Sequence, residues 1–313
     1  MNNLFIMDPL DKIQVKGDST YSLMLEAQKR YNSVYMCTPQ ELFSKNGNVF
    51  GNITKLNVSK KEPYFSMIER KEIGLSYFDV IWLRKDPPFD ISYIFTTYLL
   101  DLVPKKTLIL NNPTAVRTAN EKMIALHWSQ FCPPTLVTHE IERALSWSSQ
   151  QPGQVVIKPW DGNGGRGVLV SHFDDPNFRS MLELLTNNGQ EYILVQRYIP
   201  EIKEGDKRII LINGDPVGWM TRIPSEKDHR GNMHVGATVA SFELSARDKE
   251  ICASLKDYLK NNDLLFVGID IIGDFLTEIN VTSPTGIQEI NSLMNCCIEE
   301  LIFNSVESKL SKT

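Results

Sequence analysis

The order of strand and helix signals changes near residue 111, and this change limits the folds open to the chain more than any other feature. Before it, short apolar runs alternate with helical segments at 21–30 and 94–102. The runs expected to form strands are 4–7, 34–37, 78–83 and 107–110. Strands separated by helices predict a parallel sheet covered by helices. After residue 111, apolar runs follow one another across short turns, which predicts antiparallel hairpins and an α+β fold.

The length and charge of the chain exclude several classes of protein. Its 313 residues exceed what most single hydrophobic cores hold, so two or three domains are expected. A net charge of −5 argues against a nucleic-acid partner, and no apolar run is long enough to predict a membrane partner. The five cysteines form no CxxC pair, and the first residues, MNNLFIMDPL, do not resemble a signal peptide. We therefore expect a reduced, cytoplasmic protein.

A glycine-rich loop, DGNGGRG, separates two apolar runs, VVIKP and GVLVS. Gly162, Gly164 and Gly167 match G-x-G-x-x-G, but a strand follows this loop, whereas the dinucleotide-binding motif opens a helix. No GK[ST] follows either, which excludes a Walker A loop. A hairpin of this kind can bring backbone N–H groups to a phosphate, with Lys158 adding a positive charge. A flexible surface hairpin fits the same residues.

A second pattern, VGIDIIGDFLTEIN, alternates apolar residues with Asp270, Glu278 and Asn280. Residues two apart in a strand share a face, so Glu278 and Asn280 point the same way. The length of the turn that begins at Gly273 decides where Asp270 lies. A two-residue turn pairs Asp270 with Thr277, whereas a three-residue turn pairs it with Glu278. In the second case two carboxylates and an amide share one face, and oxygen ligands of this kind suit Mg²⁺.

Arginines outside these two patterns are candidates for holding an anion. Arg208 lies on an apolar run, and Arg222 and Arg230 lie in the loop-like segment RIPSEKDHRGN. Arg84 ends an apolar run of the first part and is followed by two rigid prolines, which suits it to hold a carboxylate. Combined with the glycine loop and the carboxylates, these arginines predict an enzyme that uses Mg·ATP on an acidic substrate.

These residues fall in eight ordered blocks that resemble bacterial glutathione synthetases of the ATP-grasp superfamily. The blocks are MDP at 7–9, KGDSTYSLMLEAQ at 16–28, RKDPPFD at 84–90, NEK at 120–122, KPWDGNGGRG at 158–167, GDKRIILINGDPV at 205–217, RIPSEKDHRGN at 222–232 and VGIDIIGDFLTEINVTSPTG at 267–286. The resemblance implies a parallel-sheet pre-ATP-grasp domain over 1–120. It implies an ATP-grasp fold after it, with a lid subdomain over 121–200 and a C-terminal subdomain over 201–313.

The resemblance also implies a reaction, in which ATP drives the joining of γ-glutamylcysteine to glycine through an acylphosphate and glutathione, ADP and phosphate are formed. It implies ATP as co-substrate, Mg²⁺ or Mn²⁺ as cofactor, and a homo-oligomer. Two alternatives stay open. One is another ATP-grasp carboxylate–amine ligase, such as one that adds glutamate to a peptide, and the other is a nucleotide-binding protein without catalysis.

The matching positions carry the roles that the family's motifs imply for ATP and metal. Those expected at ATP are Lys122 and Lys158 on the phosphates, Gly162, Gly164, Gly165 and Gly167 in the lid loop, Arg197, Tyr198 and Ile199 around the adenine, and Asp206, which reaches either the ribose or a positive partner. Asp270, Glu278 and Asn280 are expected to hold Mg²⁺. Arg208 and Arg222 are expected to stabilise the acylphosphate and the tetrahedral oxyanion.

The substrate positions are matched less completely. Those expected there are Asp18, Ser19 and Arg84 at the γ-glutamyl end, with Arg230, Asn232, Ser283 and Thr285 as secondary candidates. The chain departs from the family at Gln288, where many members carry Arg, and the loop after Arg230 has fewer glycines. These departures leave the binding of the glycine carboxylate open.

Overall fold

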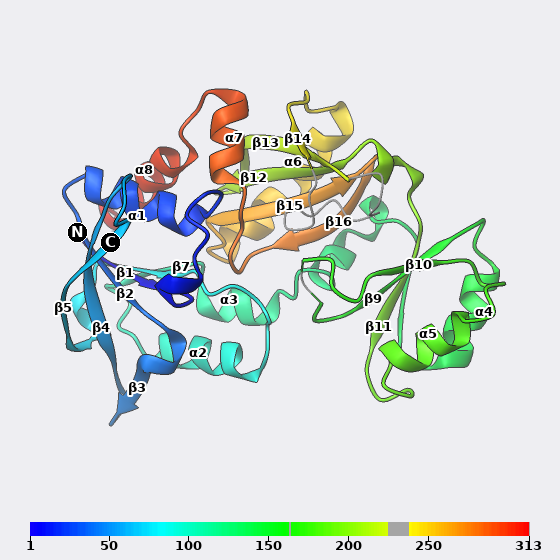
Figure 1. The fold of residues 1–313 in the computed structure, drawn as a ribbon, viewed down its shortest axis with the longest axis horizontal. Coiled ribbons are helices and arrows are strands. Elements are labelled where there is room, and N and C mark those ends of the chain that lie inside the picture. Colours follow the sequence, from blue (N-terminus) through cyan, green and yellow to red (C-terminus); the bar gives the residue numbers. More distant parts are fainter. Residues whose placement is uncertain (163, 225–237, 313) are drawn as a thin grey trace.

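The computed structural model describes residues 1–162, 164–224 and 238–312, and its strands form three sheets (Figure 1). The sequence correctly predicts the α/β class, with an N-terminal sheet followed by two further, antiparallel sheets. In the described part of the chain, no helix is long and apolar enough to cross a membrane.

The first sheet is mixed rather than purely parallel. The four predicted strands are present and parallel, as β1 (Asn2–Ile6), β2 (Ser33–Cys37), β6 (Val80–Leu83) and β7 (Leu108–Leu110). Three antiparallel strands that the pattern did not predict extend the sheet, namely β3 (Leu42–Lys45), β4 (Asn48–Val58) and β5 (Phe65–Gly74). Most of β5 is exposed and it carries the charged run ERKE, so it lacks the apolar alternation that identifies a half-buried strand.

Helices α1 (Ser19–Lys29) and α2 (Ile91–Asp101) of the first part begin at aspartate caps. Asp18 Oδ1 accepts a hydrogen bond from the Tyr21 N–H at 2.6 Å, which satisfies a backbone donor that the helix leaves unpaired. The short α3 (Pro113–Thr118) follows β7. Short 3₁₀ helices connect the elements, as η1 (Leu10–Lys12), η2 (Pro39–Glu41), η3 (Leu75–Tyr77), η4 (Ile124–Phe131) and η5 (Pro200–Lys203).

The second sheet, which we call the lid sheet, is antiparallel in the order β10-β9-β11-β8. Its strands are β8 (Thr135–Thr138), β9 (Val155–Pro159), β10 (Leu169–Ser171) and β11 (Ile193–Arg197). Helices α4 (Ile141–Ser149) and α5 (Phe178–Leu185) lie beside it (Figure 1, green). As predicted, β9 and β10 form a hairpin around the glycine loop.

The third sheet, which we call the C-terminal sheet, is antiparallel in the order β14-β13-β12-β15-β16. Its strands are β12 (Asp206–Ile212), β13 (Asp215–Ile223), β14 (Thr238–Ala240), β15 (Phe266–Ile272) and β16 (Phe275–Asn280), and the helices after β14 are α6 (Ala246–Asn261), α7 (Ile287–Met294) and α8 (Ile298–Leu310). The predicted turn between β12 and β13 is confirmed, because Asn213 and Gly214 both have positive φ, at 51° and 77°.

Hydrophobic packing joins the first sheet to the C-terminal sheet and leaves the lid sheet separate. Leu4 and Leu83 belong to the same buried core as Ile269 and Ile271. The lid sheet has a core of its own, formed by Ala144, Val155, Ile157, Phe178, Leu182, Ile193 and Val195. The boundaries predicted at residues 120 and 200 lie between β7 and β8 and between β11 and β12. The segment between them contains the lid sheet, whose buried core is separate from the cores of the other two sheets.

Candidate active site

A cavity of about 580 Å³ lies between the lid sheet and the C-terminal sheet. Most of the candidate site residues predicted from the sequence line it, although they are spread along the chain from residue 122 to residue 285. The predicted residues that line it are Lys122, Lys158, Gly162, Gly164, Gly165, Arg197, Tyr198, Ile199, Asp206, Arg208, Arg222, Asp270, Glu278, Asn280, Ser283 and Thr285. Such a volume is in the range of small-molecule sites.

The register of β15 and β16 places Asp270 opposite Glu278 and Gly268 opposite Asn280. Of the two pairings left open by the sequence, the structure has Asp270 opposite Glu278, but without the three-residue turn on which that pairing was expected to depend. The turn has two residues, because Ile272 pairs with Phe275, and an irregularity after Asp270 then shifts the register by one residue. Thr277 is the extra residue, and its hydroxyl donates to the Asp270 carbonyl at 3.1 Å. A β-bulge therefore does what a three-residue turn was expected to do.

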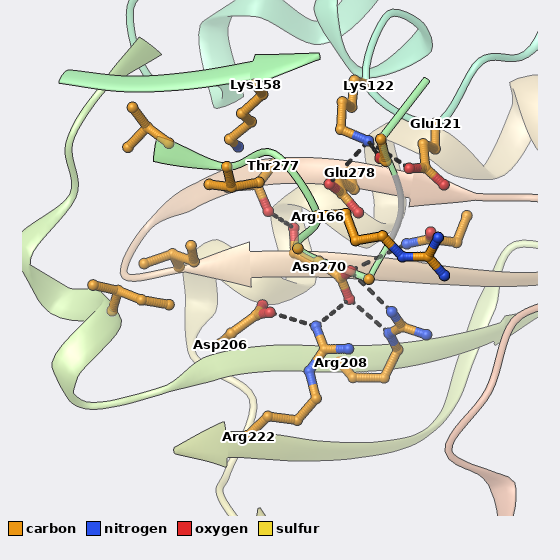
Figure 2. A pocket seen from close by; sticks show the side chains of 18 of the residues that line it. Glu121, Lys122, Lys158, Arg166, Asp206, Arg208, Arg222, Asp270, Thr277 and Glu278 are labelled. Atoms are coloured by element: carbon orange, nitrogen blue, oxygen red, sulfur yellow. Dashed lines mark hydrogen bonds and ion pairs between the residues drawn. The ribbon is translucent and has the colours of Figure 1, made fainter. Parts of the chain in front are cut away.

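Asp270 is the centre of a buried cluster of charges in the C-terminal sheet (Figure 2). Arg208, its cross-strand neighbour on β12, donates to both carboxylate oxygens, from Nε at 2.6 Å and from Nη2 at 2.9 Å. Arg222 on β13 lies 3.0 Å from the same carboxylate and also pairs with Asp206. Asp206 was expected to reach either the ribose or a positive partner, and in the structure it pairs with Arg222.

This cluster is electrostatically self-compensated. Burial raises the pKa of Asp270, but Arg208 and Arg222 outweigh burial and hold that pKa at about 2. Burial lowers the pKa of the Arg222 guanidinium, and Asp206 and Asp270 reverse the effect, so this pKa is raised overall. Both arginines are therefore held in place beside the cavity by Asp270 without any ligand.

Lys122 lies in the segment between the first sheet and η4 and reaches three acceptors in the cavity. Its Nζ donates to Glu121 Oε1 at 2.5 Å and to the carbonyl oxygen of Gly162, and it lies 3.6 Å from Glu278 Oε1. Burial lowers the pKa of Lys122, while Glu278 and Glu121 raise it, and the carboxylates prevail. Lys122 thus connects the glycine loop to the face that carries Glu278 (Figure 2).

Lys158 on β9 is buried beside Lys122, but its partner is neutral. Among the described residues, its one hydrogen bond goes from Nζ to Gln196 Oε1 at 2.9 Å. Gln196 in turn donates from Nε2 to the Thr135 hydroxyl at 2.8 Å, which donates to the Pro133 carbonyl. Burial lowers the pKa of Lys158, because the ammonium is desolvated without a carboxylate in contact. An anion entering the cavity would supply the missing charge.

The glycine loop closes one side of the cavity. Gly162 has no room for a side chain, since a Cβ there would lie 2.5 Å from Pro159 Cγ and 2.8 Å from the Arg166 carbonyl. Gly164 and Gly165 have φ of 61° and 76°, a left-handed backbone that favours glycine. Of the four predicted loop glycines, Gly167 does not line the cavity. Tight packing and left-handed backbone let the loop present main-chain groups to a ligand.

One part of the cavity wall is apolar and lies at the end of β11. Tyr198 and Ile199 line it as expected for an adenine pocket, and the Arg197 guanidinium lies 5.7 Å from the centre of the Phe275 ring. The apolar residues that complete this wall are Val156, Val168, Val170, Ile202 and Ile272. A flat hydrophobic base fits between such side chains.

The three residues expected to hold the γ-glutamyl end lie behind the cavity wall rather than on it. Arg84 is buried, and it donates to the Thr20 hydroxyl at 3.0 Å and to the carbonyl of Pro284, a cavity residue, at 2.9 Å. Among the described residues, its Nη1 has no hydrogen-bond partner. Asp18 caps α1, and the Ser19 hydroxyl accepts the Ile287 N–H at 3.3 Å. Arg230 and Asn232 fall outside the described residues.

Gln288, where the chain departs from the family pattern, contacts the loop before α1. Its Nε2 donates to the carbonyls of Val15 at 2.9 Å and Asp18 at 2.8 Å, and its Oε1 accepts the Gly17 N–H at 3.0 Å. Three hydrogen bonds thus fix the loop before α1 to α7. Gln288 holds the first part of the chain against the C-terminal part, next to Ser19.

The Glu278 face carries carboxylate and amide oxygens, the kind of atom that a hard cation prefers. Asn280 donates from Nδ2 to Asp270 at 3.1 Å, which leaves its amide oxygen as an acceptor. Burial, with Glu278 close by, raises the pKa of Glu121 to about 7, as expected where carboxylates gather with too little positive charge. Only two members of the predicted trio are acidic, and no group of three or more His, Cys, Asp or Glu with metal-site geometry occurs in the described ranges.

Several cavity residues were not selected from the sequence. They are Asp86, Pro87, Glu121, Arg166, Gln196, Thr277 and Thr282. Glu121 lies in the NEK block and Arg166 lies in the glycine loop. Their positions in these motifs could have identified them as site residues. Gln196 lies on β11, and only the pairing of β11 with β9 shows that Gln196 contacts Lys158.

Comparison with known families covers almost the whole chain. Residues 1–117 match the model of the prokaryotic glutathione synthetase N-terminal domain, and residues 121–295 match the prokaryotic glutathione synthetase ATP-grasp domain. The glutathione synthetase of Agrobacterium fabrum is 40% identical over 304 residues, covering 97% of this chain and 95% of that protein. That of Thermosynechococcus vestitus is 41% identical, covering 94% of this chain and 95% of that protein.

Solved structures with low sequence identity share the fold. D-alanyl-alanine synthetase A from Vibrio cholerae superposes with a TM-score of 0.64 at 13% identity, covering 100% of this chain and 99% of that chain. D-cycloserine synthetase DcsG superposes with a TM-score of 0.63 at 12% identity, covering 96% and 100%. At this identity the likeness establishes the ATP-grasp fold alone.

Proposed function

The chain belongs to the prokaryotic glutathione synthetase family, and from this premise we propose how its cavity performs the family's reaction. It is an ATP-dependent ligase that joins γ-glutamylcysteine to glycine. The reaction needs three anions, a nucleotide triphosphate and the carboxylates of two substrates, to come together. What remains to be assigned is which residues hold each of them.

We propose that the triphosphate of ATP lies between Lys158 and Lys122, under the glycine loop. The support is the state of Lys158, a buried ammonium with a neutral partner, for which a phosphate oxygen is the natural counter-ion. Lys122 would exchange its contact with the Gly162 carbonyl for a phosphate. The adenine would then lie against Tyr198 and Ile199 at the apolar end of the cavity.

We propose that Asp270, Glu278 and Asn280 hold a divalent cation, Mg²⁺ or Mn²⁺. When bound, the cation neutralises charge on the phosphates of ATP. The chain's own contribution is to place two carboxylates and an amide oxygen on one face of β15 and β16. Glu121 lies beside this face and would keep its negative charge once a cation is present.

The proposed reaction has two steps, and in each step one bond forms and another breaks. The C-terminal carboxylate of γ-glutamylcysteine attacks the γ-phosphorus of ATP, and the bond to ADP breaks, which gives an acylphosphate. The amine of glycine then attacks the acyl carbon, a tetrahedral oxyanion forms, and phosphate leaves as the amine loses a proton. Arg208 and Arg222 would stabilise the negative charge in both steps, because Asp270 already fixes their positions.

The substrate end of the cavity is proposed to be formed with the first part of the chain. Ser283 and Thr285 line the cavity there. The Arg84 guanidinium behind Pro284 provides a buried positive charge, and its Nη1 has no hydrogen-bond partner within the part of the chain that the structure describes. Asp18 and Ser19 would support this end through the α1 terminus and the Ile287 contact. We also propose a homo-oligomer in a reducing cytoplasm, where all five cysteines stay free.

The observation that carries the assignment is the placement of Lys158 and Lys122 across one cavity from Arg208 and Arg222 (Figure 2). It is tested by measuring phosphate release from ATP and Mg²⁺ with γ-glutamylcysteine, with and without glycine, alongside detection of glutathione. Glycine-dependent phosphate release equal to the glutathione formed is expected. Phosphate release that glycine does not change would overturn the substrate assignment, and other acid–amine pairs would then be tried.

A further inference from the structure

Arg166 lies in the glycine loop, and Figure 2 shows its side chain among those that line the cavity. The residue is exposed, and within the described ranges no hydrogen bond or ion pair engages its guanidinium. The two arginines of the C-terminal sheet are instead held by Asp270. Arg166 is therefore a cation at the cavity that the free protein leaves available to a ligand.

The main chain around Arg166 is fixed by the glycines of the loop. Gly165 and Gly167 on either side of it have φ of 76° and 70°, a left-handed backbone that favours glycine. The Arg166 carbonyl lies so close to Gly162 that a Cβ there would be 2.8 Å from the carbonyl oxygen. The loop thus holds the Arg166 main chain in one position by packing, while the guanidinium stays in solvent.

The register of the β9–β10 hairpin shows where Arg166 lies along the cavity. Val156 pairs with Val170, and both line the apolar wall. Lys158 comes two residues after Val156, and Arg166 comes four residues before Val170. In an extended chain these separations correspond to about 7 Å and about 13 Å. A triphosphate that extends from an adenine at the apolar wall therefore passes Lys158 first and Arg166 second.

The charges around the cavity favour the same ligand. The basic side chains of its described lining are Lys122, Lys158, Arg166, Arg197, Arg208 and Arg222, and the acidic ones are Asp86, Glu121, Asp206, Asp270 and Glu278. Without Arg166 the formal charges of this lining are equal. Arg166 therefore supplies positive charge that the described acidic side chains do not already balance, as the equatorial oxygens of a transferring phosphoryl group require.

We propose that Arg166 is a further catalytic residue, whose guanidinium binds the γ-phosphoryl group of ATP during its transfer. This inference rests on the proposed function, in which the triphosphate lies under the glycine loop. A carboxylate oxygen of γ-glutamylcysteine forms a bond to the γ-phosphorus, and the bond to the bridging oxygen breaks with its electron pair left on ADP. Arg166 donates two parallel N–H groups to non-bridging oxygens of the phosphoryl group and transfers no proton.

The first test compares kcat for glutathione formation in wild type, Arg166→Ala and Arg166→Lys. We expect kcat to fall on the order of 100-fold in Arg166→Ala and about 10-fold in Arg166→Lys, which keeps the charge but loses the planar fork. Urea denaturation should give the same midpoint for wild type and Arg166→Ala, because the exposed guanidinium has no partner among the described residues. A kcat of Arg166→Ala within about 2-fold of wild type would overturn the proposal.

Arg179→Ala is the matched control for the loss of an exposed arginine. Arg179 lies on α5 beside the lid sheet, is 51% exposed and pairs with Glu142 at 2.8 Å. It does not line the cavity. We expect its kcat and nucleotide affinity to equal those of wild type.

The second test separates the γ-phosphate from the rest of the nucleotide and needs no ligase activity. Wild type and Arg166→Ala are titrated calorimetrically with ADP and with an ATP analogue whose β–γ bridge cannot be cleaved, both with Mg²⁺. We expect Arg166→Ala to bind the analogue about 10-fold more weakly and ADP less than about 2-fold more weakly. Equal losses for both nucleotides would place the guanidinium on the inner phosphates and contradict the proposal.

A single turnover without glycine isolates the phosphoryl transfer. Enzyme is mixed with Mg·ATP and γ-glutamylcysteine, and the ADP formed is followed by rapid quench. Arg166→Ala should form ADP on the order of 100-fold more slowly than wild type. An unchanged rate here would mean that Arg166 acts only in the step with glycine, against the proposal. A wild type that forms no ADP would refute the proposed function instead, and the nucleotide titration would still decide the role of Arg166.

Discussion

The two walls of the cavity hold positive charge in opposite ways. In the C-terminal sheet, Arg208 and Arg222 converge on Asp270, whose pKa they hold at about 2. In the lid sheet, Lys158 is as deeply buried, but its contact is the neutral amide of Gln196, and burial lowers its pKa. One wall is neutralised before any ligand arrives, and the other is not.

The difference indicates what each wall contributes to the reaction. A compensated cluster is stable by itself, so its arginines can be held in position for charge that develops only during the reaction. An uncompensated buried ammonium costs folding free energy, and a phosphate recovers that cost on binding. We therefore expect the C-terminal wall to govern turnover and stability together, and the lid wall to govern affinity for ATP at little expense of stability.

Asp270→Asn should have the largest effect, because it removes the charge that both arginines share. We expect kcat/KM to fall by on the order of 10³-fold. We expect the free energy of unfolding to fall by about 3 to 5 kcal/mol, since buried Arg208 loses its counter-ion and buried Arg222 keeps only Asp206. Steady-state kinetics and urea denaturation of the ligand-free protein measure the two effects.

The control for Asp270→Asn is Asp215→Asn at an exposed ion pair. Asp215 pairs with Lys256 at 2.6 Å, and the two side chains are 55% and 38% exposed. This variant should change the free energy of unfolding by about 0 to 1 kcal/mol and leave turnover unchanged. If Asp270→Asn resembled this control, the C-terminal wall would not be a compensated cluster.

Lys158→Met and Lys122→Met compare the two lysines directly. Lys158→Met should weaken ATP binding by on the order of 100-fold, the worth of a charge-assisted hydrogen bond to phosphate. Lys122→Met should be the less stable variant by roughly 2 kcal/mol, because it leaves Glu121 and Glu278 without their cation. Calorimetric titration measures the affinity of each variant for ATP, and urea denaturation measures its free energy of unfolding. Equal stability of the two variants would show that the charge of Lys158 is compensated in the free protein.

Gln196→Leu should have a smaller effect on the lid wall, since it removes a group that positions Lys158 and leaves the ammonium in place. We expect the affinity for ATP to fall about 10-fold, with kcat changed less. Thr135→Val, one hydrogen bond further along, should cost only about 2-fold to 3-fold in affinity. Equal ATP affinities of wild type and Gln196→Leu would mean that Lys158 needs no positioning partner.

The two walls were not equally readable from the sequence. The blocks around Lys158 and Asp270 placed both residues in one site, and the alternation of β16 placed Glu278 and Asn280 on one face. The bulge at Thr277 could not be predicted, because it depends on the fit between two strands and not on the turn residues. The contrast between Lys158 and Lys122 was also hidden, since their partners Gln196 and Glu278 lie 38 and 156 positions away.

The fold, too, could be predicted from the sequence only where local patterns determine it. Strong local signals, such as the strand and helix alternation of the first part and the turn at Asn213, were confirmed. The strands β3 to β5 were missed. The charged residues of β5 carry no burial pattern, whereas β4 has buried residues at largely alternating positions that could have identified it. Arg84 was expected on the cavity wall, but the packing of the first part against Pro284 places it behind that wall. Contacts between distant segments decide such positions.

Glu121→Gln gives the smallest expected effect and tests the junction of the two walls. The pKa of Glu121 is raised to about 7 from an ordinary value of about 4.5, so between these pH values the folded state binds more protons than the unfolded state. The contribution of Glu121 to stability is therefore complete below pH 4.5 and is lost as the pH rises through 7. A glutamine does not titrate, so this loss should be absent from the variant.

The measurement is the free energy of unfolding of both proteins in urea from pH 4.5 to 7.5, without nucleotide or divalent cation. The stability of Glu121→Gln relative to wild type should increase by on the order of 1 to 3 kcal/mol across this range. Taking the difference matters, because burial also raises the pKa of Asp206 to about 7 and that decline is common to both proteins. Parallel curves would mean that Glu121 is already ionised at pH 5, fully neutralised by Lys122. The compensated arrangement of the C-terminal wall would then extend to Lys122, and Lys158 would be the lysine that carries positive charge kept for ATP.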